Sequence, residues 1–174
     1  RCTPSRSRPE RLRAGNRTVK VYSNTTPLLA FASIERFDIL QAVHGELHVV
    51  ESVKRECQAG LPIMVPNLLK LDWVCLVDDP QEADGRFLAL DAGERDTISE
   101  ALRDKADLLL IDERLGRNLA EYYGLRVVGT LGTLLKAKKM GIISEFLPAV
   151  RALQEHGFWY AENLVRRLAN DVGE

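Results

Sequence analysis

The sequence has few of the features that would assign a class at once. Its three cysteines, Cys2, Cys57 and Cys75, are odd in number and have no C-x-x-C spacing, which argues against a disulfide framework and against a zinc knuckle. No apolar run approaches the roughly 20 residues that a membrane-spanning helix needs, because the longest runs, such as 108–111, soon meet a charged residue. We therefore expect a soluble protein of the reducing cytoplasm with no membrane partner.

Residues 1–17 contain six arginines, one glutamate and almost no apolar side chain. Such a segment has no core to bury, so it is predicted to be a disordered basic arm. It also lacks the apolar stretch of a secretory signal. Residues 18–174 hold 18 basic and 24 acidic side chains, a net charge of about −6, against −1 for the whole chain. This balance does not by itself indicate a nucleic-acid partner, which has to be argued from a local site.

The remaining chain, residues 18–174, has the length and alternating pattern of one α/β domain. Short aliphatic or β-branched runs alternate with longer helical patterns, which favours a three-layer α/β/α fold with a central parallel sheet of four to five strands. The most convincing central strand is 107–111, since its apolar run implies burial on both faces. The other expected strands are 19–23, 47–50, 73–77 and 125–128, and the expected helices are 27–34, 35–43, 51–59, 67–71, 93–105, 113–123, 131–140, 144–155 and 161–169.

Polar residues follow the expected strands where an α/β sheet usually binds its ligands, beyond the carboxyl ends and near the point where strand order reverses. Asn24 follows the first strand, and Glu56 lies in the helix after the second. Glu94 opens the helix before strand 107–111, and Asp112 ends that strand. Oxygen ligands of this kind suit Mg²⁺ or Mn²⁺, which can activate a water and neutralise charge on a phosphodiester. The pattern indicates metal-dependent hydrolysis.

Each of these residues also has an ordinary structural interpretation. Glu56 or Glu94 taken alone is most often a solvated helix carboxylate, and an Asp in the position of Asp112 is a common helix N-cap. Only their joint placement favours a site. His44 and His48 are separated by a glycine and the start of a strand, so they are not expected to bind zinc.

Two pairs of residues near these positions, and one pair near the C-terminus, have two interpretations each. Thr25 and Thr26 either contribute hydroxyls to the site or cap the helix that Pro27 opens. Arg114 and Arg117 share a helix face, where they grip phosphates or are solvated. Trp159 and Tyr160 are expected in a core or subunit contact rather than in a base-stacking platform.

Four stretches resemble PIN domains of the subgroup related to the VapC toxins of bacteria and archaea, and the resemblance covers nearly the whole chain from Val19. They are SNTTPLLAFASIERFDIL from residue 23, VVESVKREC from residue 49, LDAGERDTISEAL from residue 90 and LLLIDERLGRNLAEYYGLRVVGTLGTLLKAKKMGII from residue 108. The family places an Asp after the first strand, a Glu in the next helix, an acid opening a later helix and an Asp after a buried strand. Glu56, Glu94 and Asp112 match the last three positions.

Two details of the match concern the number of acids. Asp91 and Asp96 flank Glu94 and are secondary candidates for the third position. Asn24 occupies the place of the first Asp, so its neutral oxygen gives the site one negative charge fewer than the family pattern. Thr25 and Thr26 match the family's hydroxyl positions near metal or water.

The resemblance implies a VapC-type endoribonuclease, a hydrolase of RNA. Asn24, Glu56, Glu94 and Asp112 would be its catalytic residues and the ligands of Mg²⁺ or Mn²⁺. Thr25, Thr26, Arg114 and Arg117 would bind RNA. It also implies a small antitoxin protein as partner, and a homodimer. The rival hypothesis is a catalytically weakened PIN-like module that binds RNA or a protein partner, its metal site degraded by Asn24.

Overall fold

The computed structural model describes residues 19–59 and 63–174, so the basic arm predicted for residues 1–17 lies outside the described residues. Five strands form one sheet in which every neighbouring pair is parallel, in the order β3-β2-β1-β4-β5. They are β1 (Val21–Ser23), β2 (Leu47–Val50), β3 (Val74–Val77), β4 (Leu108–Leu110) and β5 (Val127–Val128). The predicted parallel sheet of four to five strands is confirmed.

Eight α-helices and two short 3-10 helices connect the strands in the described part of the chain. The α-helices are α1 (Thr25–Ser33), α2 (Asp38–His44), α3 (Glu51–Gln58), α4 (Ala92–Arg103), α5 (Arg114–Tyr122), α6 (Thr130–Lys139), α7 (Phe146–Glu155) and α8 (Glu162–Asn170), and the 3-10 helices are η1 (Leu68–Lys70) and η2 (Gly85–Phe87). Three predicted helix starts are displaced by two or more residues, and one of them is that of α7, which begins at Phe146 rather than at 144. The first helix begins at Thr25, before Pro27, and the second begins at Asp38 because Glu35 adopts a left-handed backbone conformation with φ of 56°, which ends helical geometry there.

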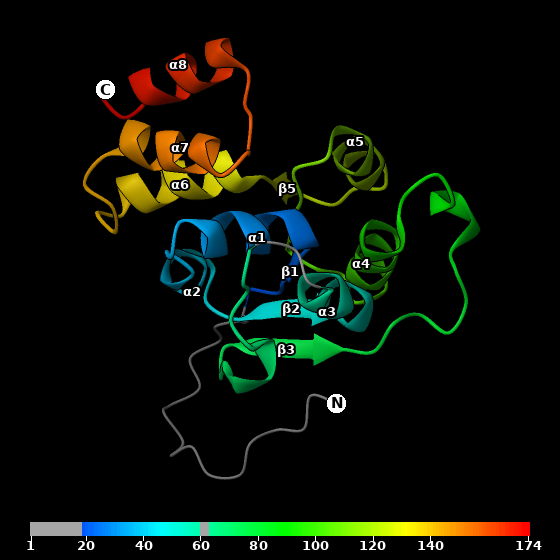
Figure 1. The fold of residues 1–174 in the computed structure, drawn as a ribbon. Coiled ribbons are helices and arrows are strands. Elements are labelled where there is room, and N and C mark those ends of the chain that lie inside the picture. The colour runs from blue at the N-terminus through cyan, green and yellow to red at the C-terminus, as the bar shows by residue number, and fades with distance from the viewer. Residues whose placement is uncertain (1–18, 60–62) are drawn as a thin grey trace, which may run out of the picture.

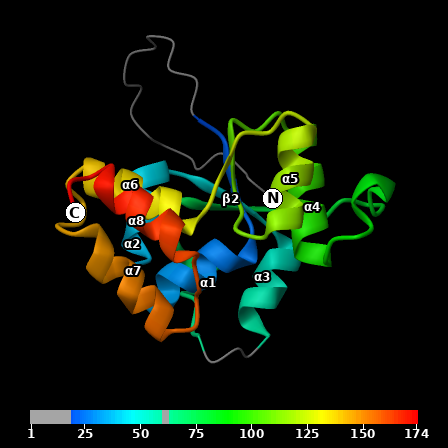
Figure 2. The same cartoon turned by 90° about the horizontal axis from the view of Figure 1, so that it is seen from above.

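The helices and the sheet form the three layers that the sequence predicts. Figure 1 shows α6, α7 and α8 stacked in succession above α1, and α6 also packs against α2. Figure 2 shows α4 and α5 side by side on the opposite side of the molecule from α7. The strands between these layers bury almost every side chain of β1, β2 and β4. Because these strands are buried and closely packed, they hold the residues at their carboxyl ends in fixed positions.

Strand order reverses between β1 and β4. The chain moves from β1 to β2 and β3 on one side, then crosses to β4 and β5 on the other. The backbone N–H of Asn24 donates to the carbonyl oxygen of Leu110 at 2.9 Å, which ties the exits of β1 and β4 together. Because α1 begins after one exit and α5 after the other, both helix N-termini meet at this switch point.

Two properties of the described residues bear on the cysteines and on membranes. Cys57 is a buried free thiol, whereas Cys75 is disulfide-bonded. The sequence argument against a disulfide therefore does not hold for Cys75. Within residues 19–59 and 63–174, none of the helices combines the length and the apolar character needed to cross a membrane.

Candidate active site

Asn24 lies at the exit of β1, where it is 3% exposed. It is the N-cap residue of α1, but its side chain makes no capping hydrogen bond. Its amide nitrogen instead lies 3.4 Å from Oε2 of Glu113, and its Oδ1 is buried without a hydrogen-bond partner. A buried polar oxygen in that state costs free energy. Asn24 therefore presents an unused oxygen donor at the switch point.

Glu56 extends from α3 to the N-terminus of α4. Its Oε1 accepts the Gly93 N–H at 3.0 Å, and its Oε2 accepts the Thr25 hydroxyl. A Cβ atom on Gly93 would lie 2.5 Å from Oε1, so only glycine lets the carboxylate come this close. The free N–H groups and positive end of α4 stabilise this negative charge.

Glu94 lies in the first turn of α4 and is 6% exposed. Its Oε1 is buried without a hydrogen-bond partner, and Gly116 of α5 lies so close that a Cβ there would approach this oxygen to 3.3 Å. Burial, together with the charges of Asp91, Glu113 and Glu56, raises the pKa of Glu94 to about 7. Three further carboxylates thus act on Glu94, as expected of a shared cluster.

Glu113 completes the cluster and was not among the residues selected from the sequence. Its Oε1 accepts the Thr26 hydroxyl, and its Oε2 faces the Asn24 amide nitrogen. The sequence did carry a signal for it. Successive side chains of an extended segment point to opposite faces, so the adjacent acids Asp112 and Glu113 cannot both face the same way. One of them had to point elsewhere, and the choice between them was open.

Asp112 points away from this cluster, toward α6. Its Oδ1 accepts the Thr130 N–H at 2.8 Å, and its Oδ2 accepts the Thr130 hydroxyl at 2.5 Å. A Cβ atom on Gly129 would lie 2.5 Å from Oδ1. Burial raises the pKa of Asp112, although the hydrogen bonds from Thr130 oppose the shift. The carboxylate therefore sits on the N-terminus of α6 as Glu56 sits on that of α4.

The secondary acids lie in two different places. Asp91 is the N-cap of α4, and its Oδ1 accepts the Glu94 N–H at 2.8 Å. Asp96 is buried and pairs with Arg95 at 3.0 Å. It is not among the charges that act on Glu94. Glu94 is thus the acid of α4 that faces the cluster, Asp91 borders it, and Asp96 lies apart.

The two arginines of α5 differ in their surroundings. Arg114 is exposed at the start of the helix. Arg117 is half-buried, donates to the Ile111 carbonyl oxygen at 2.9 Å and lies 3.9 Å from a carboxylate oxygen of Glu121. Both are at the carboxyl edge of the sheet, and Arg117 is on the same side as Asp112, because both border one pocket.

The site residues fit a hard divalent cation by the kind of atom they offer. Every candidate donor is an oxygen, as Mg²⁺ and Mn²⁺ prefer, and the oxygens Asn24 Oδ1 and Glu94 Oε1 are buried without partners. Among residues 19–59 and 63–174, no three His, Cys, Asp or Glu side chains are already arranged to hold an ion. The hydroxyls of Thr25 and Thr26 donate to one oxygen each of Glu56 and Glu113, which holds these carboxylates in the cluster while leaving them further acceptor sites.

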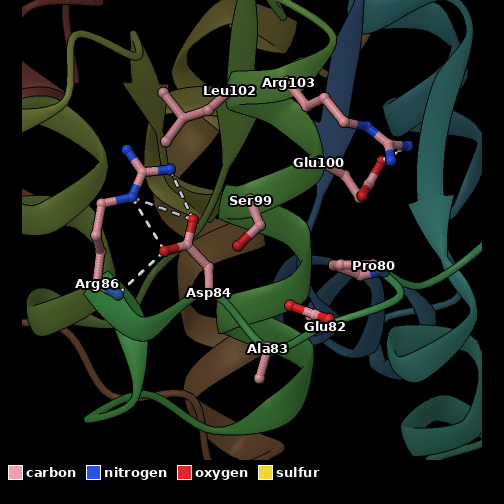
Figure 3. A pocket seen from close by; sticks show the side chains of 9 residues that line it. All are labelled: Pro80, Glu82, Ala83, Asp84, Arg86, Ser99, Glu100, Leu102 and Arg103. Atoms are coloured by element: carbon pink, nitrogen blue, oxygen red, sulfur yellow. Dashed lines mark hydrogen bonds and ion pairs between the residues drawn. The ribbon is translucent and has the colours of Figure 1, made fainter.

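A second hollow, of about 610 Å³, lies along the C-terminal half of α4 and the segment before it. Figure 3 shows Arg86 bound by Asp84 and Arg103 beside Glu100, with Ser99 between the two pairs. Both of its arginines are neutralised by carboxylates, and Glu82 adds further negative charge. Such a hollow repels phosphate rather than binding it, so the switch point is the better candidate site.

Comparison with known families identifies the family of this fold. A family model described as a PIN domain, DUF3368, matches residues 20–174. The match spans every strand and helix of the described fold. A search of curated proteins gave no significant match.

Proposed function

This chain belongs to the PIN-domain family, and from that premise we propose that it is a metal-dependent endoribonuclease that hydrolyses RNA phosphodiester bonds. PIN domains are generally nucleases and typically use divalent metals. The choice of RNA, and of Mg²⁺ or Mn²⁺, is the proposal. One observation carries it: two buried oxygens without partners, Asn24 Oδ1 and Glu94 Oε1, lie in a carboxylate cluster at the switch point of the sheet.

The carboxylates of the cluster would share the work unequally. The pKa of Glu94 is raised to about 7, so its carboxyl group would release a proton when the site is loaded below that pH. Glu56 is already fixed at the N-terminus of α4. Glu94, Glu56, Asp112 and Asn24 are the proposed ligands, and Glu113 is added to them because it contacts Asn24. The bound ion would supply an activated water and neutralise charge on the phosphate.

The groups around the cluster would hold the RNA strand. Arg114 is exposed next to the site and offers a guanidinium to a phosphate. Arg117 is half-buried beside Asp112. The hydroxyls of Thr25 and Thr26 donate to Glu56 and Glu113 and so keep these carboxylates in the cluster. No side-chain nucleophile is required, because a water performs the attack.

The test is cleavage of a single-stranded RNA with Mg²⁺ or Mn²⁺ by the parent protein and by Glu94→Gln, which removes one charge at constant size. Asp96→Asn is the matched control, since it also removes a buried carboxylate from α4. We expect Glu94→Gln to lose most cleavage and calorimetric Mn²⁺ binding, and Asp96→Asn to keep both. Equal cleavage by all three proteins would remove Glu94 from the mechanism.

The rival function is a PIN module that binds RNA or a protein without cutting it. It is favoured by the neutral Asn24 at the first acidic position and by the hydrogen bonds that occupy Asp112. A binding-only module would bind RNA, but it would give no cleavage and no Mn²⁺ heat that depends on Asp112. Repeating the titration on Asp112→Asn therefore separates the two functions.

The partners remain part of the proposal. The resemblance to VapC-like PIN proteins supports two partners. One is a small antitoxin that covers the candidate site, and the other is a second copy of the chain in a homodimer. Light scattering of the purified chain, alone and with the product of the neighbouring reading frame, would test both. A monomer that does not bind that product would contradict the toxin–antitoxin setting without affecting the nuclease.

A further inference from the structure

A pocket of about 390 Å³ adjoins the acidic edge on the side to which Asp112 points. Asp112 and Arg117 line its polar part, and residues of β5, α6 and α8 line the rest, including Val128, Leu131 and Leu164. Asp112 therefore borders the pocket and also belongs to the proposed site. A ligand in this pocket would therefore lie next to the proposed metal site.

Trp159 also lines this pocket, and its side chain is 78% exposed. Of the two contacts expected for Trp159, the core contact is therefore wrong, and the subunit contact stays a prediction. A large aromatic side chain left in water loses the favourable burial that its area could provide, and such residues mark binding sites when they border a concave surface. The indole is thus available to an incoming planar group.

The residue next to Trp159 explains why the indole stays at this pocket. The Tyr160 side chain lies against Thr130, and burial raises the pKa of this phenol. The Thr130 hydroxyl donates to Asp112. Tyr160 therefore anchors the segment between α7 and α8 to the start of α6. This anchor holds Trp159 beside Asp112 and preorganises the pocket.

The chemistry of the lining favours a nucleobase over other occupants. The pocket combines a flat aromatic face, aliphatic walls and one guanidinium within a volume suited to a small ring system. Stacking on an aromatic side chain with a nearby cation is how proteins hold bases of single-stranded nucleic acid. The walls tolerate any base, since the described lining offers few hydrogen-bonding groups for reading a base edge.

We propose that Trp159 is the stacking platform for a base that neighbours the scissile phosphate, and that Arg117 contacts the strand beside it. This inference rests on the proposed ribonuclease function, because the strand reaches the pocket from the acidic edge. It makes Trp159 a substrate-positioning residue of the site. The assignment comes from the exposure of Trp159 at the pocket and from the anchoring of the neighbouring Tyr160 at Thr130. Trp159 lies far in sequence from every acidic residue of the cluster.

The first experiment measures base stacking without any cleavage. The chain has two tryptophans, and the other one, Trp73, packs against Phe37 at 5.5 Å between ring centroids. In Trp73→Phe the only indole is Trp159. A short 2′-O-methyl oligoribonucleotide titrated in EDTA should quench its fluorescence, whereas an abasic strand of equal length and charge should not. Equal quenching by both strands would overturn the stacking.

The second experiment measures affinity by anisotropy of a labelled strand, again in EDTA. Trp159→Ala should weaken binding of the base-containing strand roughly tenfold, and Trp159→Phe should recover part of it. The abasic strand should bind both variants and the parent equally. Tyr122→Ala, which removes an 81% exposed aromatic residue from α5, is the matched control and should bind like the parent.

The outcomes separate this inference from the proposed function. If the parent cleaves RNA and Trp159→Ala binds and cleaves equally well, the base platform is refuted and the nuclease stands. If the parent quenches with the base-containing strand but never cleaves, the platform stands and the nuclease fails. Absence of binding by the parent refutes the platform. An equal loss of binding to abasic and base-containing strands in Trp159→Ala would also overturn the stacking, because the effect would not depend on the base.

Discussion

Asp112 and Glu113 are adjacent in sequence, yet they occupy two different environments. Asp112 sits on the N-terminus of α6, where Thr130 satisfies both of its oxygens. Glu113 faces α1 and contacts Asn24, and its charge helps to raise the pKa of Glu94 to about 7. One carboxylate is therefore stabilised by hydrogen bonds, while the other belongs to a cluster of like charges. Matching a motif by position does not tell which of the two acids faces the cluster.

The largest effect on both activity and stability is expected from Asp112→Ala, since Asp112 is a proposed metal ligand and also accepts two hydrogen bonds from Thr130. The change should abolish metal-dependent RNA cleavage if Asp112 turns to the ion, and it leaves the Thr130 N–H and hydroxyl without their acceptor. Losing these two hydrogen bonds should lower the free energy of unfolding by about 1–3 kcal/mol. Thermal melts and a cleavage assay measure the two losses separately, and the chain should stay folded.

Thr130→Val provides the control for this change. It removes the hydroxyl that binds Asp112 and lies against Tyr160 but keeps the carboxylate. It should therefore destabilise the chain and weaken RNA binding, while metal-dependent cleavage at saturating RNA stays in place. Full cleavage by Asp112→Ala, with no nuclease activity in a mock preparation, would show that this carboxylate is purely structural.

A smaller effect is expected from Glu113→Gln, which tests the other side of the comparison. If Glu113 belongs to the site, its neutralisation should reduce the cleavage rate by roughly 100-fold. Stability should change little or rise in metal-free buffer, because a like charge is removed from Glu94. Glu121→Gln is the matched control, since Glu121 is an exposed acid on the same helix. Parent-like cleavage by Glu113→Gln would leave Asp112 as the only acid of this pair in the mechanism.

The pH dependence of stability tests whether the cluster is as crowded as its contacts indicate. The pKa of Glu94 is about 7 in the folded chain against an ordinary 4.5. Between these pH values the folded state keeps a proton that the unfolded state has lost, so stability falls as the pH rises. In EDTA, this contribution should amount to on the order of 1–2 kcal/mol between pH 5 and pH 8, after allowance for solvent screening.

Glu94→Gln should flatten that pH profile, because the variant has no proton to lose at this position. Urea denaturation at pH 5 and pH 8 gives the comparison directly, and Asp96→Asn should keep the slope of the parent. If Glu94→Gln and the parent show the same slope, Glu94 does not titrate in this range and the crowding of the cluster is not supported.

The sequence predicted the fold more fully than it predicted the site. The apolar run 108–111 gave a central strand, since burial on both faces leaves a clear signal. The short runs at 47–50 and 73–77 also gave strands close to those observed, although the edge strand β3 is only partly buried. The start of α2 was missed because nothing in the local pattern predicts the left-handed conformation of Glu35. Local periodicity fixes the elements, but a single backbone angle sets where a helix begins.

The site was predicted as a set of positions rather than as a set of contacts. Asn24, Glu56 and Glu94 do meet near one edge of the sheet, because the carboxyl ends of parallel strands share that edge. The direction of Asp112 depends on Thr130, which is 18 residues away in sequence and is placed by β5. No spacing rule carries that information, so the choice between Asp112 and Glu113 needed the tertiary structure.

The smallest effect, and the sharpest test of the cluster, is expected from Asn24→Asp. The change restores the charge that the family pattern has at this position and hardly alters the size of the side chain. In EDTA the new carboxylate would face Glu113 in place of an amide donor, so the free energy of unfolding should fall by about 1 kcal/mol. With Mn²⁺ present, one more negative ligand should tighten binding.

Asn24→Asp should lower stability in EDTA but increase the stabilisation by Mn²⁺. Because these two effects have opposite signs, a general change in stability cannot be mistaken for them. A tenfold gain in Mn²⁺ affinity adds about 1.4 kcal/mol to the folded state at saturating ion, or roughly 3–5 °C in melting temperature for a chain of this size. The Mn²⁺-induced shift should therefore be larger in Asn24→Asp than in the parent. Asn118→Asp, an exposed position on α5, should show the parent's shift. If Asn24→Asp also shows only that shift, Asn24 lies outside the ligand set, and the acidic cluster must work through Glu56, Glu94 and the Asp112–Glu113 pair alone.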